Sequence, residues 1–518
     1  MKRRTVLSAG LLPFVPSAAT DRMSGVAPNG LPPVPVAPAS AARTVAPAST
    51  ARTGGATPGG LSLVTVAPAS AARTDRRPVG GGVHDPRAGK TFISWGGFQE
   101  DNYVQEYDHR RHTWSAPMRV AGGDNDSHNY PTLIQADDGH LLVFRGLHNR
   151  ELWVARSPRP HSIEGTWTDT IIPEGLGATY PMPVKTSDGT IFVFIRETAG
   201  DFDPNYPTDT RPMKYVRSVD NGLTWQSSAA LTGDRWCIAP LNRPDNMNEI
   251  YIGQLRHEPA TRAHPERIAM VWTLAGGGPE GHLHDRYHRN VYYAAFSPAD
   301  LRFRSAADLR FRSAGDPRFG SAEDPRFGSA GDLRFGSAAG HDAAAGHDST
   351  AGHDLGTSID NDDQEQHLKV ADTELQTVNP RSPDYISLVG STLGGRAPFV
   401  VWMQIDAQGQ VHGHSAVHLG GGWRHRELGT GARFRDMEPA GDLSWRVYAT
   451  PDPAAPGVDM YRLIPGFSFR RESSLVTPQA VQRIEVIAGS RSPARLLVTG
   501  NSSAREVTIA DGDVYVAG

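Results

Sequence analysis

The chain has 518 residues, with 52 lysines and arginines against 56 aspartates and glutamates and a formal net charge of −4. This balance argues against a nucleic-acid or anionic-membrane partner. The 55 glycines and 40 prolines are typical of a turn-rich β protein diluted by low-complexity sequence. A single cysteine, Cys237, excludes an intramolecular disulfide framework.

The first residues predict an export signal. A basic start at 2–4 precedes a short apolar stretch at 6–16 and small residues suited to cleavage at 17–19. The paired arginines before the apolar stretch resemble a twin-arginine signal. No segment reaches the length of about 18 apolar residues that a membrane span requires. Residues 1–19 are therefore expected to direct secretion without membrane insertion, with a disordered basic start as the alternative.

Residues 20–85 are rich in alanine, proline, serine, threonine and glycine. They contain near-copies of one nonapeptide at 36–44 and 66–74. Such sequence buries too little apolar surface to offset the entropy of ordering it. We expect a disordered linker over 20–85 and a folded part over 86–518.

The folded part is predicted to be an all-β propeller. Short β-rich runs alternate with Gly, Asp, Asn and Pro turns, and no long stretch has helical periodicity. A unit of Tyr-Pro, Asp-Gly and a hydrophobic run starts at Tyr130 and again 50 residues later at Tyr180, with weaker copies from Pro240 and Tyr385. At about 50 residues per unit, the length suits roughly seven four-stranded blades, and two sandwich domains are less favoured.

One turn is diagnostic of these blades. Residues 218–225 read Ser-Val-Asp-Asn-Gly-Leu-Thr-Trp, which is an Asp box. Asp220 is suited to accept local backbone N–H bonds, Gly222 to adopt a positive φ, and Trp225 to pack between outer strands. The box is therefore expected to be a structural corner without a chemical role.

Low-complexity sequence interrupts the fold at 299–354. Five eight-residue units fill 299–338, and three Ala-Gly-His-Asp copies end at residues 342, 348 and 354. Eight residues are too few for a blade, and the alternating charges favour solvation. We expect a disordered insertion without function, with metal capture by the His-Asp pairs as the alternative.

Polar side chains gather at equivalent ends of the repeated strands. His128 stands just before one strand, and His148 lies 20 residues later, at the end of the next. In the following blade Tyr180 precedes a strand, and Arg196 ends the next strand 16 residues later. A hydrophobic strand that ends in Arg or His delivers that group to a rim of the fold. These four residues are therefore predicted to share a pocket.

This pattern of His128, His148, Tyr180-Pro and Arg196, beside an Asp box, resembles the ulvan lyases of seven-bladed propeller type. More broadly it resembles the BNR-repeat family that contains them. The resemblance covers about 90–298 and resumes at about 368–450. It implies a secreted polysaccharide lyase that cleaves an ulvan-like, uronic-acid-containing polymer by β-elimination.

The implied chemistry suits the residue types. A uronate lyase removes the C5 proton beside a carboxylate and expels the O4 leaving group, and Arg196 can neutralise the carboxylate as the enolate develops. The resemblance makes His128 the base and Tyr180 the acid, with roles that swap when the substrate presents its C5 proton on the other face. It implies that His148 binds or orients the substrate. Tyr251 is a further pocket candidate, and catalysis is expected to need no cofactor.

A second group of histidines is a candidate metal site. His282 and His284 would share one strand face, and His257 could join them around a zinc ion. Lyases of this type can carry a structural zinc, and the stretch that holds these histidines resembles the region where that zinc lies. No cysteine completes the ligand set, so an ordinary polar surface is the alternative.

Two other functions fit the same fold, because a fold does not fix a reaction. A glycoside hydrolase of sialidase or rhamnosidase type can also carry Asp boxes, although the three-arginine pattern of a sialidase is not evident. A non-catalytic carbohydrate-binding propeller would need only aromatic rims. The expected protein is a monomer whose partner is a polysaccharide, anionic in the case of the lyase.

Overall fold

The computed structural model describes residues 61–73, 80–123, 125–128, 130–146, 148–261, 264–309, 355–375, 382–393, 397–419, 422–428, 432–441, 444–451, 455–464, 468–504 and 507–518. The chain divides into two units, Met1–Thr50 and Ala51–Gly518, and all described residues belong to the second. The predicted export signal therefore lies outside the described residues, as does most of the predicted linker.

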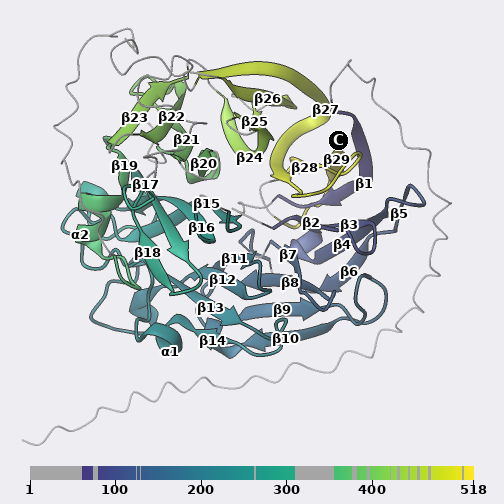
Figure 1. Cartoon of the computed structure of the whole chain (residues 1–518), viewed down its shortest axis with the longest axis horizontal. Coiled ribbons are helices and arrows are strands. Elements are labelled where there is room, and N and C mark those ends of the chain that lie inside the picture. The colour runs from purple at the N-terminus through teal and green to yellow at the C-terminus, as the bar shows by residue number, and fades with distance from the viewer. Residues whose placement is uncertain are drawn as a thin grey trace, which may run out of the picture. The chain divides into compact units, whose positions relative to one another are not determined.

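The described residues form antiparallel sheets that follow one another in chain order (Figure 1). The first sheet contains β2 (Gly82–Asp85), β3 (Lys90–Gly96), β4 (Asn102–Asp108) and β5 (Thr113–Trp114), with β6 (Met118–Ala121) also beside β4. The second contains β7 (Thr132–Gln135), β8 (Leu141–Gly146), β9 (Leu152–Arg156) and β10 (Thr168–Ile172). The third contains β11 (Thr179–Lys185), β12 (Ile191–Arg196), β13 (Met213–Ser218) and β14 (Gln226–Ser227).

The later sheets continue the pattern. The fourth contains β15 (Glu249–Glu258), β16 (Arg267–Gly276), β17 (Tyr287–Ser297) and β18 (Arg302–Arg304), with β19 (Lys369–Ala371) paired to β17. The fifth contains β20 (Val389–Leu393), β21 (Ala397–Ile405), β22 (Val411–Leu419) and β23 (Gly422–Glu427). The sixth has seven strands in the order β1 (Leu63–Ala71), β29 (Gly512–Ala517), β28 (Leu496–Gly500), β27 (Ser468–Val486), β26 (Pro456–Ile464), β25 (Ser444–Thr450) and β24 (Arg433–Gly441).

Helices in the described ranges are short. They are α1 (Ser228–Thr232), α2 (Asn361–Asp363), the π-helical turn η5 (Gln364–Leu368) and the 3-10 turns η1 (Phe98–Glu100), η2 (Pro173–Gly175), η3 (Ala199–Asp201), η4 (Gly278–Glu280) and η6 (Tyr385–Ser387). Among the residues described, no helix has the length and apolar character that crossing a membrane requires.

The Asp-Gly repeat of the sequence marks the hairpin turns between inner strands. Gly139, between β7 and β8, has a φ of +87°, and Gly189, between β11 and β12, has a φ of +85°. A side chain at either position would be strained, so glycine allows the tight turn. The strand that follows each turn, β8 or β12, is buried along its whole length.

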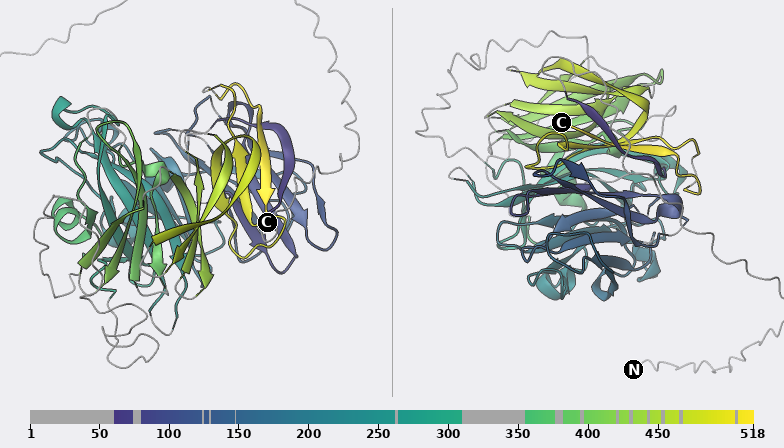
Figure 2. Two further views of the ribbon diagram at one scale, coloured as in Figure 1. Left: turned by 90° about the horizontal axis from the view of Figure 1, so that it is seen from above. Right: turned by 90° about the vertical axis from the view of Figure 1, so that its right-hand side faces the viewer.

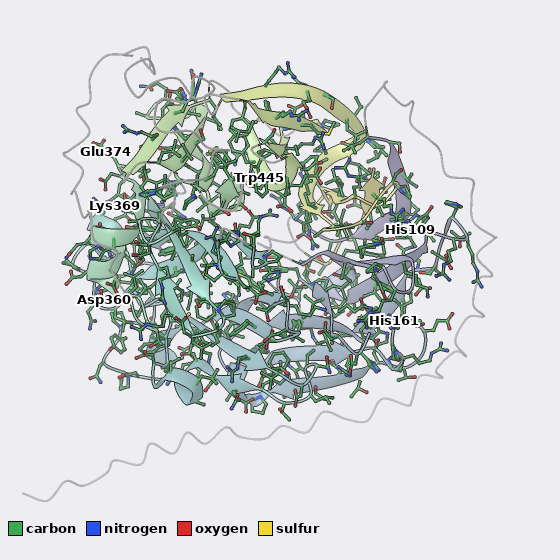
Figure 3. The ribbon with its side chains drawn as sticks, viewed as in Figure 1. His109, His161, Asp360, Lys369, Glu374 and Trp445 are labelled. Atoms are coloured by element: carbon green, nitrogen blue, oxygen red, sulfur yellow. The ribbon has the colours of Figure 1, made fainter. Side chains whose placement is uncertain are left out.

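Hydrophobic cores lie between consecutive sheets, which face one another in the turned views (Figure 2). Another core joins the two halves of the seven-stranded sheet, and one more joins its last strands to the first sheet. Side chains fill these spaces in Figure 3, where the labelled Trp445 belongs to the core between the fifth and sixth sheets. Each of these cores contains side chains from both of the neighbouring sheets or half-sheets: Phe92 and Val143, Phe144 and Val193, Phe194 and Trp272, Val271 and Trp402, Phe399 and Val447, Tyr448 and Val498, and Leu497 and Trp95.

The predicted linker boundary at residue 85 is wrong. Residues 63–71 form β1, which pairs antiparallel with β29, and residues 82–85 form β2. Ala67 and Ala71 are buried beside Trp95, in the core that joins the first sheet to the last strands of the sixth. Small side chains suit this crowded position, but composition alone gives no hint of a partner strand at the far end of the chain.

The predicted insertion also begins too early. The first eight-residue unit contains β18, in which Phe303 is fully buried and packs on Phe296 with ring centroids 5.1 Å apart. That unit therefore supplies the outer strand of the fourth sheet. The rest of the predicted insertion, 310–354, lies outside the described residues.

Candidate active site

Four tyrosines from consecutive sheets meet at the ends of the inner strands. Tyr130, Tyr180, Tyr251 and Tyr385 form one buried cluster with Ala275. Ring centroids are 6.2 Å apart from Tyr130 to Tyr180, 6.1 Å from Tyr180 to Tyr251, and 4.6 Å from Tyr251 to Tyr385. Tyr130, Tyr180 and Tyr385 each begin a copy of the sequence repeat, so the repeat places three of these four residues in one cluster.

Arg196 lies within this cluster at the end of β12. Its side chain is 1% exposed, and its guanidinium carbon lies 4.7 Å from the ring centre of Tyr180 and 4.4 Å from that of Tyr251. Although burial opposes its charge, Tyr251, Tyr180 and Glu249 together hold the pKa of Arg196 above its usual value. Arg196 is thus a permanent cation between two aromatic faces.

The guanidinium of Arg196 has room for a further acceptor. None of its nitrogen atoms makes a hydrogen bond within the part of the chain that the structure describes. The carboxylate of Glu249 approaches Nη1 only to 4.0 Å. A buried cation with unused donors is costly, and an anionic ligand would relieve that cost.

His128 and His148 form a stacked pair opposite the tyrosines. Their ring centroids are 4.0 Å apart with an interplanar angle of 21°. Asp126 joins them: one carboxylate oxygen accepts from Nδ1 of His128, and the other accepts from Nδ1 of His148 at 2.9 Å. Because both Nδ1 atoms face the carboxylate, the Nε2 atoms are the ring nitrogens directed away from it.

The electrostatics of this group follow from those hydrogen bonds. Burial favours the neutral form of Asp126, but the bonds from His128 and His148 outweigh it and lower its pKa far below the usual value. The hydrogen bond to Asp126 favours the charged form of His148. Burial and the nearby His128 and Arg196 outweigh it and lower the pKa of His148 overall. Asp126 is therefore ionised and His148 is neutral near pH 7.

Tyr180 owes its position to an irregularity in β11. Its φ is +58°, and the register with β12 shifts between Thr179 and Met182, which indicates a bulge. A bulky residue in this conformation costs about 1–3 kcal/mol, and such strain is found most often at functional sites. Thr179 is fixed through Asn149, since its hydroxyl donates to the amide oxygen at 3.0 Å and accepts from the backbone N–H at 3.0 Å. Asn149 follows His148, so the bulge is tied to the histidine pair.

The structure therefore brings together the predicted residues His128, His148, Tyr180, Arg196 and Tyr251. The ring of His128 lies 5.4 Å from that of Tyr180, and Tyr180 in turn contacts the guanidinium of Arg196. These separations are short enough for the groups to touch one sugar residue. A small cavity lined in part by Tyr180, Arg196, Tyr251 and Tyr385 lies at this point.

A buried carboxylate that the sequence did not single out, Glu249, stands behind Arg196. It accepts from Nδ1 of His284 at 2.6 Å and from the backbone N–H of Asp285 at 2.7 Å. Nε of Arg211 lies 3.6 Å away. Glu249 therefore balances the positive charge of two buried arginines, Arg196 and Arg211, and holds the 282–288 loop against the site.

The same loop supports the tyrosine cluster. Nε2 of His288 bonds to the carboxylate of Asp285 at 2.7 Å. Its ring stacks on Tyr385 at 5.5 Å with an interplanar angle of 12°, and lies 5.0 Å from Tyr251. His282 and His284 of this stretch were predicted as metal ligands, and His288 was not predicted as part of the pocket wall.

The predicted zinc ligands His257, His282 and His284 do not come together. His257 bonds to Glu266 at 2.6 Å near one end of β15, whereas His284 bonds to Glu249 at the other end. Eight residues of extended strand separate those ends by about 26 Å. His282 is half exposed and lies 3.1 Å from the side-chain amide of Asn248. These three histidines cannot bind one ion, since β15 is long enough to separate His257 from His284.

Another group has the geometry of metal ligands among the residues described. Asp126, His128 and His148 each offer a ligand atom, and these atoms all lie within 4.8 Å of one another. The carboxylate already occupies both Nδ1 atoms, so this group is accounted for by its internal hydrogen bonds.

Comparison with known proteins gives a family match over the part of the chain that contains this site. Residues 90–308 match the family described as "BNR repeat-containing family member". This range contains the four predicted site residues and the Asp box. The BNR-repeat resemblance expected from the sequence is thereby confirmed.

Particular relatives narrow the comparison. The chain is 30% identical over 172 residues to "Ulvan Lyase-PL25" of Pseudoalteromonas sp. (strain PLSV), covering 28% of this chain and 32% of that protein. It is also 30% identical over 165 residues to "Ulvan lyase" of Alteromonas sp. (strain LOR), covering 27% of this chain and 31% of that protein. The aligned part thus spans about a third of the length of these curated relatives.

The fold extends the similarity beyond the aligned sequence. The solved structure of a "PL25-Ulvanlyase bound to -[GlcA(1-4)Rha3S]-" superposes with a TM-score of 0.60 at 16% sequence identity, over 88% of this chain and 96% of that one. An unbound structure of the same kind gives the same values. The all-β, propeller-like fold is therefore shared with these proteins.

Proposed function

We propose that the protein is a secreted polysaccharide lyase that cleaves ulvan or a similar uronate-containing polymer by β-elimination. The observation that carries the proposal is the buried guanidinium of Arg196, whose donors are unused, next to Tyr180 and the His128–His148 pair. The names of the relatives support ulvan as the polymer. Secretion rests on the signal expected at residues 1–19.

We further propose that the sheets are seven blades of one propeller. The seven-stranded sheet then counts as two blades that share the 19-residue strand β27. One of these blades runs from β24 to β27, and the other contains β27, β28, β29 and β1. The pairing of β1 with β29 would join the two ends of the folded part.

In the proposed reaction Arg196 binds the uronate carboxylate. Its planar fork can donate two hydrogen bonds to that group, and its charge stabilises the enolate that forms when C5 loses its proton. Burial strengthens this effect because little water screens the charge. The phenol of Tyr251, whose pKa is raised mainly by burial, stays protonated beside it.

His128 then acts as base and Tyr180 as acid. Nε2 of His128 takes the proton from C5, the C4–C5 double bond forms, and the bond from C4 to the leaving O4 breaks as the Tyr180 hydroxyl protonates that oxygen. Asp126 holds the proton on Nδ1 of His128, so Nε2 is the ring nitrogen that accepts the C5 proton in this scheme. His148, neutral and held by the same carboxylate, would contact a sugar hydroxyl. Glucuronate and its C5 epimer iduronate present the proton on opposite faces, and the two roles would swap between them.

Each proton transfer in this scheme is assigned to a side chain, so the proposal includes no metal or other cofactor in catalysis. The proposed partner is the anionic polysaccharide, and the proposed active species is a monomer.

The test is ultraviolet absorbance of the unsaturated uronate product during incubation with ulvan. The wild-type protein should generate the signal, and His128→Ala, Tyr180→Phe and Arg196→Ala should lose it. Tyr107→Phe, which removes a tyrosine hydroxyl from β4 in the first sheet, is the matched control and should keep the absorbance signal. Release of reducing sugar without the absorbance would indicate a hydrolase, and binding without either would indicate a carbohydrate-binding propeller. Either result would refute the proposal.

A further inference from the structure

A groove that the proposed reaction does not use opens beside the first sheet. It offers about 700 Å³ of space, part of it open to solvent, and is lined by Trp95, Phe98, Tyr103, Pro117 and the end of β1 at Ser70. Ala69 and Ala510 complete the lining, so three of its seven residues are aromatic. Its size and lining suit a sugar ring rather than an ion.

The aromatic side chains form a platform. Tyr103 stacks on Trp95 with ring centroids 5.9 Å apart and an interplanar angle of 17°. The ring of Phe98 is 50% exposed at the start of η1. Gly97 permits this arrangement, because a Cβ there would lie 2.5 Å from the ring of Tyr103. Flat aromatic faces of this kind pack against the C–H face of a pyranose through their buried area and negative π surface.

The turn that carries Phe98 is strained. Gln99 and Glu100, which follow it, have φ values of +54° and +56°. Each such residue costs about 1–3 kcal/mol and persists only where the surrounding structure enforces it. The full burial of Glu100 and a hydrogen bond of 2.7 Å from the backbone N–H of Gln99 to the carbonyl of Val507 hold the turn, which leaves Phe98 half exposed at the edge of the groove.

Polar groups at the groove suit an anionic sugar. Nε1 of Trp95 is buried and has no hydrogen-bond acceptor among the described residues. Arg119, 54% exposed, is held at the turn by two bonds to the carboxylate of Asp101, at 2.5 Å and 2.9 Å. The exposed guanidinium can bind the carboxylate or sulfate groups of such a ligand.

The groove is tied to the loop that carries the histidine pair. Asp101, which ends the strained turn, accepts from the backbone N–H of Gly123 at 3.0 Å. A Cβ on Gly123 would lie 2.2 Å from the backbone carbon of Glu100, so the two segments are in close contact. Asp126 follows only three residues later, within about 10 Å of chain. The groove therefore lies at the same end of the sheets as the candidate active site.

We propose that this groove binds a pyranose residue of the polysaccharide at a distance from the bond that is cleaved. A long chain would then be held at two points, on Phe98 and on Arg196. The identity of the polymer rests on the proposed function, but binding in the groove can be measured without turnover.

Affinity electrophoresis in gels that contain ulvan tests the proposal on the inactive Tyr180→Phe background. Adding Phe98→Ala should raise the dissociation constant about threefold to tenfold, the loss expected for one aromatic contact. Phe98→Trp should preserve binding. Leu223→Ala is the matched control, because Leu223 is 65% exposed on the Asp-box turn, far from the groove in the strand order.

A second measurement uses the active protein. Phe98→Ala should lower kcat/KM for the polymer by a similar factor and leave kcat/KM for a short oligosaccharide unchanged. Only the polymer reaches both Phe98 and Arg196. Equal retardation of Phe98→Ala and Leu223→Ala would overturn the proposal. A change in the mass of the protein in solution caused by Phe98→Ala would also overturn it, since the groove would then be an interface between copies. Polymer binding that depends on Phe98 without any elimination would refute the lyase and leave the groove standing.

Discussion

Replacing Asp126 by asparagine removes the negative charge that joins His128 to His148. The carboxylate accepts from both Nδ1 atoms and from the backbone N–H of His128 at 2.9 Å. An amide has one oxygen, so one of the two imidazole bonds is lost, and an amide N–H facing His128 would move the imidazole proton to Nε2. Hydrogen bonds to charged groups contribute about 1.5–3 kcal/mol each, so kcat should fall about 10- to 100-fold.

The assay is the initial rate of unsaturated uronate formation over a range of ulvan concentrations. Asp137→Asn is the control, because that carboxylate forms an exposed ion pair with Lys185 at 2.7 Å and should not affect turnover. Asp126→Asn should also lower the pKa of His148 further, because the negative charge that favours its charged form is removed. An unchanged kcat, or an effect confined to KM, would refute the role of Asp126 in orienting the base.

A stability measurement gives an independent check on Asp126. Its pKa in the folded protein lies below the ordinary value of 3.8. The ionised group therefore contributes stability that is fully present above pH 3.8 and is lost as the pH falls through the folded pKa. The difference in unfolding free energy between wild type and Asp126→Asn should be largest near neutral pH and shrink in acid. A difference that grows in acid would contradict the assignment.

Three further predictions follow from the structure. Arg196→Lys keeps a cation but loses the planar fork, so kcat/KM on ulvan should fall about a hundredfold, and a rate within twofold of wild type would refute bidentate binding. His414 stacks on Trp402 at 5.4 Å, and burial lowers its pKa to about 4. Between pH 6.5 and about 4 the unfolded chain then binds more protons than the folded protein, so stability should fall as the pH drops through that window. The melting temperature of His414→Gln should depend less on pH there. Asp220 accepts from the backbone N–H of Thr224 at 2.9 Å and from its hydroxyl at 2.6 Å, so Asp220→Ala should lower the unfolding free energy by about 1–2 kcal/mol while leaving kcat unchanged.

The site residues could be predicted where the sequence repeats. Tyr130 and Tyr180 begin matching strands of adjacent sheets, and His148 and Arg196 follow or end the matching next strands. Repeated units place equivalent positions at one end of the fold. The linear pattern was therefore sufficient to predict that His128, His148, Tyr180 and Arg196 lie together.

Residues outside the repeat could not be found this way. Asp126 lies in a run of Asp and Asn residues, where nothing distinguishes the one that bridges two histidines. Glu249 reaches the site from β15, and only long-range packing reveals it. The prediction placed His257 beside His284, because the sequence spacing does not show that the ten-residue strand β15 separates them.

The fold was misjudged in the same way where a segment depends on a distant partner. β1 resembles the linker that precedes it in composition, but pairing with β29 and burial of its alanines place it in the sheet. The first copy of the eight-residue repeat likewise becomes β18 because Phe303 finds Phe296.

The mass of the oligosaccharides released from ulvan tests the central claim most directly. If His128, Tyr180 and Arg196 carry out β-elimination, the new non-reducing ends will be unsaturated and lighter by one water molecule than hydrolysis products. Tyr180→Phe should release almost none of them. Products of full hydrolytic mass, or unsaturated products made at the wild-type rate by Tyr180→Phe, would contradict the account.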